Sequence, residues 1–119
     1  MDWADASDLI PAAKKPAVRR LLKTDDTTVV AFAFAPGQEL REHTAAHAIL
    51  LTCARGAVIF TAEGRSRRLA TGQVIRLDAR VPHAVTADED ALMLLTMLHA
   101  HESGQLPAPV AEALGEADG

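Results

Sequence analysis

The sequence contains few of the residues that stabilise secreted scaffolds or bind nucleic acids. Its single cysteine, Cys53, excludes an intrachain disulfide and a cluster of thiolate metal ligands. It has no tyrosine, three phenylalanines and one tryptophan, which leaves little surface for stacking on bases or sugars. No apolar stretch approaches the roughly 20 residues that span a bilayer. The acidic N-terminus also lacks the basic and apolar regions of a signal peptide. We therefore expect a cytoplasmic protein with no membrane partner.

The charge balance argues against nucleic acid as a partner. The chain has 12 basic and 16 acidic residues and a formal charge of -4, so no strong positive field attracts a polyanion. With 119 residues, of which 49% are hydrophobic and 24% charged, the chain is expected to fold as one domain with a single core.

Alternating residues and frequent turns predict an all-β protein. In residues 28–35 the bulky Val30, Phe32 and Phe34 alternate with small residues, as in a strand with one inward face. After residue 56, turn residues recur about every 8–12 positions, which is typical of a β-sandwich or barrel. We expect strands over residues 18–23, 28–35, 57–63, 65–70, 73–78, 83–87 and 91–99.

Local rules conflict in residues 38–55. Alanine, leucine, arginine and glutamate favour a helix here. In that helix His43 and His47 would share a face at the i, i+4 spacing that binds metals. The segments on either side are predicted strands with short connections, and a lone helix would interrupt them. We therefore predict extended structure.

Residues 91–99, with the sequence ALMLLTMLH, are almost wholly apolar, so both faces must be covered. The segment is expected to be a central strand or a dimer interface. We expect a homodimer through this strand or the N-terminal arm, because a small two-sheet roll leaves edges that dimerisation covers. The expected organisation is an irregular arm (residues 1–17), a β-barrel (residues 18–102) and a flexible tail (residues 103–119) that is at most a frayed helix.

Two glycine-bounded segments each carry a histidine at a set distance from a glycine. The first contains Gly37, His43 and Gly56, and the second contains Gly72 and His83. Over roughly residues 18–99, these spacings resemble the two motifs of the cupin superfamily. The resemblance implies an all-β, single-domain jelly roll or barrel of the cupin type. It also implies a site at which three histidines and a glutamate typically bind a catalytic metal.

Other motif positions depart from the cupin pattern. Ala45 stands at the second histidine position and Ile49 at the glutamate position, so two of the four implied metal ligands are missing. In the second motif Asp78, Arg80 and Ala87 stand where the pattern has proline, glycine and asparagine.

His47 offers a substitute ligand. If one unbroken strand ran through residues 43–53, His47 would share a face with His43 and join His83 in a three-imidazole site. Such a site suits zinc, iron, nickel or copper. The alternative places His47 in a loop facing solvent. A protein without any metal cofactor is also left open. His99 and His101 have the i, i+2 spacing of a metal pair on a strand, but we interpret them as a solvated strand end.

The expected pocket is apolar because an isoleucine replaces the glutamate. Its lining is predicted to comprise Ala45, Ile49, Leu51, Cys53 and Val85. We interpret the cysteine as an inert, buried hydrophobic residue. A ligand should be a largely apolar small molecule with one polar group facing His43 and His83.

Four arginines admit two interpretations. Arg65, Arg67, Arg68 and Arg76 could gather on one sheet face and hold an anionic ligand. Such a run is also typical of a solvated edge that discourages pairing with other chains.

Three functions fit these features, because a fold does not by itself supply a reaction. The first is a small-molecule binding or sensing module with a degenerate histidine site. The second is a metal-dependent enzyme, an oxygenase or isomerase, that uses His43, His47 and His83. The third is a structural partner with a vestigial site.

Overall fold

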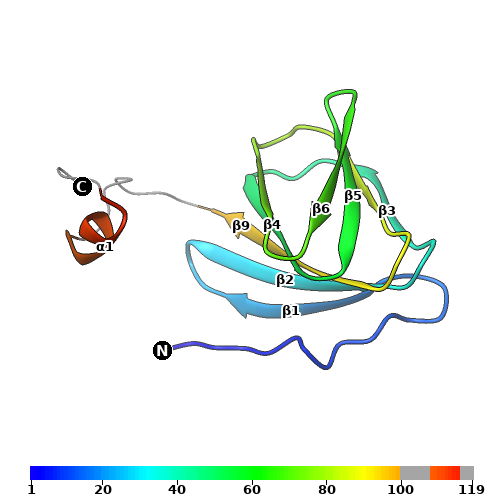
Figure 1. The fold of residues 1–119 in the computed structure, drawn as a ribbon, viewed down its shortest axis with the longest axis horizontal. Coiled ribbons are helices and arrows are strands. Elements are labelled where there is room, and N and C mark those ends of the chain that lie inside the picture. Colours follow the sequence, from blue (N-terminus) through cyan, green and yellow to red (C-terminus); the bar gives the residue numbers. More distant parts are fainter. Residues whose placement is uncertain (100–107, 116–119) are drawn as a thin grey trace.

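A computed structural model describes residues 1–99 and 108–115 of the chain. Almost all regular structure in these residues is β-strand, which confirms the all-β prediction (Figure 1). The strands are β1 (Ala17–Lys23), β2 (Thr27–Phe34), β3 (Glu39–His43), β4 (Ala48–Arg55), β5 (Ala57–Ala62), β6 (Arg65–Ala70), β7 (Val74–Leu77), β8 (His83–Thr86) and β9 (Ala91–Leu98).

The strands form two antiparallel sheets that pack face to face. One sheet has the order β1-β2-β9-β4-β7 and the other has the order β3-β8-β5-β6. Strands β6 and β7 are neighbours in sequence but end different sheets, so an open edge separates them. The roll is therefore not closed along this edge.

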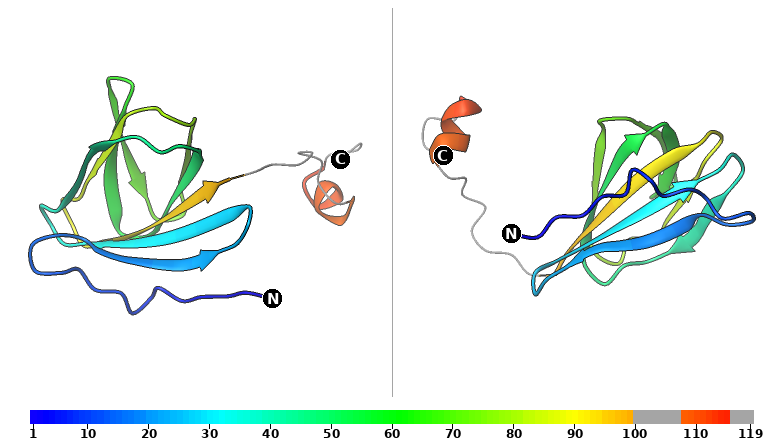
Figure 2. Two further views of the ribbon diagram at one scale, coloured as in Figure 1. Left: turned by 180° about the vertical axis from the view of Figure 1, so that it is seen from behind. Right: turned by 90° about the horizontal axis from the view of Figure 1, so that it is seen from below.

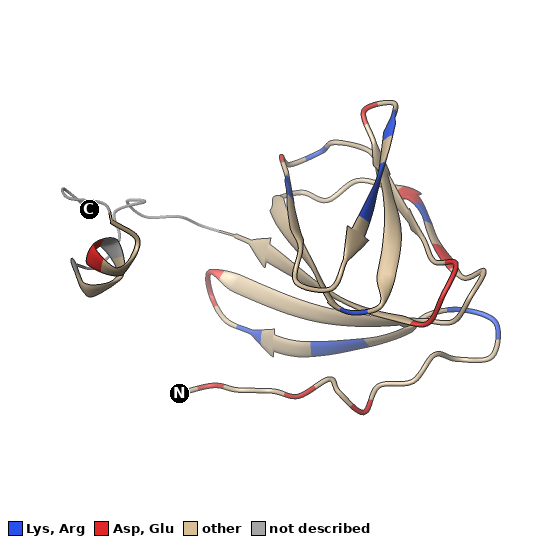
Figure 3. Ribbon diagram, viewed as in Figure 1, with Lys and Arg blue, Asp and Glu red and all other residues tan. Residues whose placement is uncertain are grey.

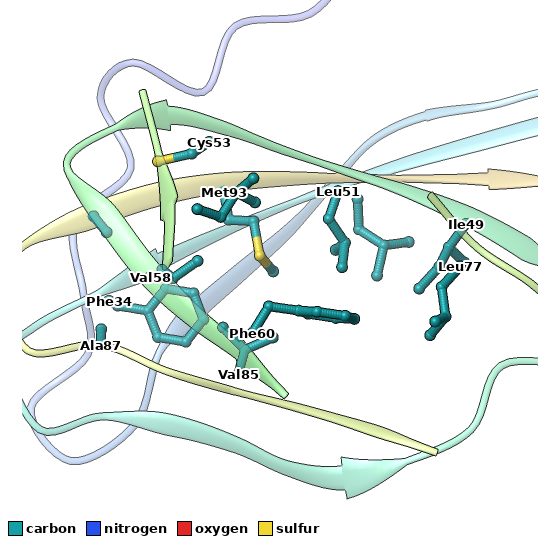
Figure 4. Close-up of a cluster of buried hydrophobic side chains, with 13 residues drawn as sticks. Phe34, Ile49, Leu51, Cys53, Val58, Phe60, Leu77, Val85, Ala87 and Met93 are labelled. Carbon is teal, nitrogen blue, oxygen red and sulfur yellow. The ribbon is translucent and has the colours of Figure 1, made fainter. Parts of the chain in front are cut away.

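The core lies between the inner faces of the two sheets (Figure 4). Ile49 and Leu51 enter it from β4, and Val58 and Val85 enter it from the opposite sheet. Each such side chain contributes about 1.5–3 kcal/mol when fully buried. Four of the five residues expected to line a pocket are thus packed in the core, each 1% exposed: Ile49, Leu51, Cys53 and Val85.

Strand β9 is apolar on both sides because both sides are covered. It lies between β2 and β4, which confirms a central strand, and Met93 faces the core between the sheets. Its outer face carries Leu92, and the N-terminal arm lays Ala6 and Leu9 against that face. Figure 2 shows the dark blue arm running along the outside of this sheet. The expected homodimer stays a prediction.

Residues 38–55 form two strands, so the rejection of a helix is confirmed. Strand β3 pairs with β8, and β4 pairs with both β7 and β9. These ladders satisfy the backbone of the segment and bury its apolar side chains, which outweighs the weak helical preference. Residues 44–47 separate the two strands.

The glycine that ends the first motif permits a close backbone crossing. Gly56 has φ of 72°, and a Cβ atom there would collide with the carbonyl oxygen of Asp90. Only glycine fits both the left-handed conformation and this approach. The motif spacing therefore reflects packing at this position.

The predicted tail, residues 103–119, lies partly outside the described residues. Its described part contains the short helix α1 (Ala108–Ala113). The expected flexibility of the rest stays a prediction, and His101 also lies outside the described residues. No helix in the described ranges has the length and apolar character needed to cross a bilayer.

Candidate functional site

His43 and His83 come together at one end of the roll. His43 ends β3 and His83 begins β8, and the two residues are partners in the ladder between these strands. Their ring centroids are 4.4 Å apart, with an angle of 58° between the rings. His43 is exposed, whereas His83 is 2% exposed. The pair therefore runs from the surface into the core.

The same local hydrogen bond fixes the tautomer of both rings. Nδ1 of His43 lies 2.7 Å from the carbonyl oxygen of Arg41, and Nδ1 of His83 lies 2.8 Å from that of Val81. A carbonyl oxygen only accepts, so each Nδ1 carries a proton and donates it. In a neutral ring held in this way, Nε2 presents a lone pair.

Nε2 of His83 is buried and has no hydrogen-bond partner among the described residues. Leaving such an atom unsatisfied costs about 1–3 kcal/mol. Burial lowers the pKa of His83, the nearby His43 lowers it further, and the bond to Val81 opposes both effects. The ring is therefore neutral at pH 7, and its Nε2 is an acceptor that lacks a donor.

Phe60 forms one wall beside this histidine. Its ring centroid lies 5.8 Å from that of His83, with 29° between the rings. Sequence reasoning missed this residue. The alternation of Val58, Phe60 and Ala62 in β5 could have revealed it, because side chains two apart on a strand share a face.

The structure does not bring His47 to His43 and His83. The break at residues 44–47 removes the shared strand face, and His47 stacks on His99 with centroids 5.0 Å apart and 3° between the rings. Nε2 of His99 is also 2.9 Å from the hydroxyl of Thr28.

Two other predicted site residues make contacts within the protein itself. Ala45 is half-buried against the core, and its carbonyl oxygen accepts a bond from the backbone N–H of Arg80. The Cys53 thiol donates towards the carbonyl oxygens of Arg55 and Gly56, at 3.3 and 3.2 Å. Burial raises the pKa of this thiol, which agrees with an inert cysteine.

The histidine pair supplies only part of the metal site that the cupin resemblance implies. Two imidazole nitrogens with free lone pairs are suitable ligands, and bonds from Nδ1 to carbonyl oxygens are typical of metal-binding histidines. The third and fourth ligand positions are Ala45 and Ile49, which cannot coordinate. Within residues 1–99 and 108–115, no three His, Cys, Asp or Glu side chains are grouped to hold a metal. The described residues therefore do not fit the four-ligand site.

The architecture defines a class: a small antiparallel double-sheet roll with a histidine pair at one end. The cupin domain family matches residues 30–99, which is more than half of the chain. The chain therefore belongs to the cupin family, and the predicted fold is confirmed. No curated protein matches the chain.

Solved structures from several bacteria share this fold. A conserved protein of unknown function from Streptococcus pyogenes is 23% identical with a TM-score of 0.72, and the match covers 86% of this chain and 98% of that one. A cupin superfamily protein from Desulfitobacterium hafniense is 22% identical with a TM-score of 0.70, covering 76% and 84%. KdgF from a Halomonas species is 22% identical with a TM-score of 0.67, covering 85% and 90%. At these identities the likeness concerns the fold.

Proposed function

We propose that this cupin domain binds a small, largely apolar molecule that donates a hydrogen bond to the histidine pair. The observation that carries the proposal is the buried Nε2 of His83, which has no partner among the described residues. A ligand that supplied the missing donor would recover the free energy lost by burying this atom.

The chemistry of the pair limits the ligand. Because Nε2 of His83 presents a lone pair, the ligand must carry a hydroxyl or N–H group at this point. The surroundings are apolar, with Phe60 packed on His83, so the rest of the ligand should be an aromatic or aliphatic body.

Phenol and its methyl ether anisole test this requirement. They have similar bodies, but only phenol donates a hydrogen bond. We expect phenol at millimolar concentration to shift the Nε2 resonance of His83 in nitrogen-15 NMR spectra and anisole to leave it unchanged. The response should persist in His47→Ala, and phenol binding measured by calorimetry should disappear in His83→Ala. Equal responses to both compounds, or no response to either, would contradict the proposal.

A metal-dependent enzyme is the second candidate. It is favoured by the two hydrogen bonds that hold each Nδ1 and direct a free lone pair from each Nε2. Mass spectrometry of the purified, untagged protein above pH 7 measures its metal content directly. Near-stoichiometric zinc, iron, nickel or copper that is lost in both His43→Ala and His83→Ala would support this function. If the metal is also lost in His47→Ala, His47 is a third ligand and the three-imidazole site is supported.

A vestigial site, the third candidate, predicts different results in these experiments. It predicts that phenol does not bind and that the protein contains no metal after incubation with all four metals. The double change of His43 and His83 to alanine would then leave every measured property except stability unchanged.

A further inference from the structure

A groove of about 170 Å³ lies at the open edge between β6 and β7. Its apolar side chains come from both sheets, and one of them is Phe60, which also packs on His83. The groove and the histidine pair therefore share a wall. The full lining is Phe60, Ala62, Glu63, Arg65, Arg67, Ile75, Arg76 and Leu77.

Strand register places Arg65 in line with the histidines. His43 is opposite His83, His83 is opposite Ala62, and Ala62 is opposite Arg65. Directly opposed residues of adjacent strands point to the same side of a sheet. One row of side chains thus runs from His43 to Arg65 across all four strands.

A second row runs beside the first on the same face. Val85 is opposite Phe60, and Phe60 is opposite Arg67. Two residues further along β6 lies Leu69, which is 1% exposed in the core. Because alternate residues share a face, Arg65 and Arg67 stand on the core-facing side of β6. Figure 3 shows that Lys and Arg positions occur along this strand.

The neighbouring arginines are held in ion pairs. Arg68 stands on the outer side of β6 and pairs with Glu89 at 3.2 Å, and Arg76 pairs with Asp78 at 2.7 Å. Among the described residues, no carboxylate lies within ion-pair distance of Arg65 or Arg67. The acidic residue of the groove, Glu63, offsets one of these two charges, so the groove has a net positive charge.

Inward-pointing charges at an edge strand also prevent association between sheets. That role requires charge alone and no particular neighbours. Here both arginines border an apolar groove, and Arg65 lies in the same row as the buried His83, whose Nε2 has no partner among the described residues. The arginine charges, the apolar floor of the groove and the acceptor Nε2 of His83 together match an amphiphilic anion.

We propose that the groove holds the carboxylate of a small hydroxy acid through Arg65 and Arg67, while its hydroxyl group donates to Nε2 of His83. This inference rests on the proposed function and defines its ligand class. Positions 83 and 65 are two strand spacings apart, which is about 10 Å. An aromatic ring with the two groups at opposite ends, together with the long arginine side chain, fits this span.

Calorimetric titration of the full chain with three probes tests the proposal. The probes are 4-hydroxybenzoate, the uncharged 4-hydroxybenzamide and benzoate, which lacks the hydroxyl group. We expect 4-hydroxybenzoate to bind most tightly. The double change Arg65→Gln and Arg67→Gln should weaken its binding at least 10-fold and leave 4-hydroxybenzamide unaffected. Arg68→Gln is the matched control on the opposite face of β6 and should change binding less than twofold.

The outcomes separate this inference from the proposed function. Equal binding of 4-hydroxybenzoate and 4-hydroxybenzamide, or unchanged binding of the acid by the double variant, overturns the role of the arginines. If His83→Ala still abolishes binding in that case, the proposed function stands. Binding of the acid that depends on the arginines but not on His83 overturns the proposed function and the hydroxyl contact. If no probe binds at millimolar concentration, both fail.

Discussion

Replacement of His83 by leucine is expected to stabilise the protein while removing its ligand site. Leucine has a volume similar to that of histidine, so it fills the space beside His43 and Phe60 without leaving a cavity. It also removes the buried Nε2 that has no partner among the described residues. Binding sites often sacrifice stability in this way.

The magnitude follows from two opposing terms. Removing the unsatisfied atom gains about 1–3 kcal/mol in the free energy of unfolding. Losing the bond from Nδ1 to the Val81 carbonyl costs about 1 kcal/mol. The net gain at pH 7.5 should be about 1 kcal/mol, which raises the melting temperature by roughly 4 °C.

The gain in the free energy of unfolding from His83→Leu should increase as the pH falls. Burial lowers the pKa of His83 from its ordinary value of 6.5, so below pH 6.5 the unfolded chain binds more protons at this residue than the folded protein does. Folded His83 therefore destabilises the wild type progressively as the pH falls through 6.5 towards its lowered pKa. Leucine has no such titration, so the difference between variant and wild type should grow by at most about 1.4 kcal/mol per pH unit.

Urea unfolding of both proteins between pH 5 and pH 8 measures these differences. His47→Leu serves as the control, because His47 is only half-buried and stacks on His99 elsewhere. A loss of more than 1 kcal/mol in His83→Leu at pH 7.5 would refute the reasoning, since Nε2 would then have a partner in solution. A difference that does not change with pH would show that His83 titrates normally in the folded protein.

Three further predictions concern packing and reactivity. Gly56→Ala should lower the free energy of unfolding by roughly 3 kcal/mol or more, because its Cβ would strike a backbone oxygen in the turn before β9. Gly72→Ala should lower it by only about 1–2 kcal/mol, because its Cβ would meet no atom and only the left-handed backbone conformation is strained. Leu9→Ala should lower the free energy of unfolding by about 2 kcal/mol, because Leu9 covers the outer face of the sheet, whereas exposed Ile10→Ala should change it by less than about 0.5 kcal/mol. Cys53 should resist thiol reagents at pH 8 in the native protein and react fully in urea, because it is buried and its pKa is raised.

Chemical denaturation measures the first two, and absorbance during labelling measures the third. Equal losses in Gly56→Ala and Gly72→Ala would contradict the close crossing. Equal effects of Leu9→Ala and Ile10→Ala would show that the N-terminal arm is not packed as described. Rapid labelling of native Cys53 would place the thiol at the surface.

Periodicity located the strands because each pairs with neighbours that accept its alternating pattern. The predicted strand at residues 65–70 coincides with β6, and the segment at 91–99 differs from β9 by one residue. The apolar character on both sides of β9 indicated two covered faces. It could not reveal that Leu9 lies on one of them, because the N-terminal arm has no periodic signal of its own.

The histidines show where sequence reasoning ends. The spacing from the motif glycines indicated that His43 and His83 belong to one site, and the ladder between β3 and β8 makes them partners. The side on which His47 lies depended on whether the strand continues through residues 44–47. Strand continuity is a tertiary property, because β3 and β4 belong to different sheets and the chain must cross between them.

The sequence by itself predicted the all-β fold class, the resemblance to the cupin family and the shared site of His43 and His83. These depend on alternation, turn residues and spacing along the chain. Only the tertiary structure decided that Ile49 and Val85 fill the core, that Nε2 of His83 is left without a partner among the described residues, and that Arg65 lies in the same row as the histidines. These features arise where strands distant in sequence meet. Their physical cause is the pairing of β8 with β3 and β5, because the choice of partner strand is a property of the whole sheet that local periodicity does not specify.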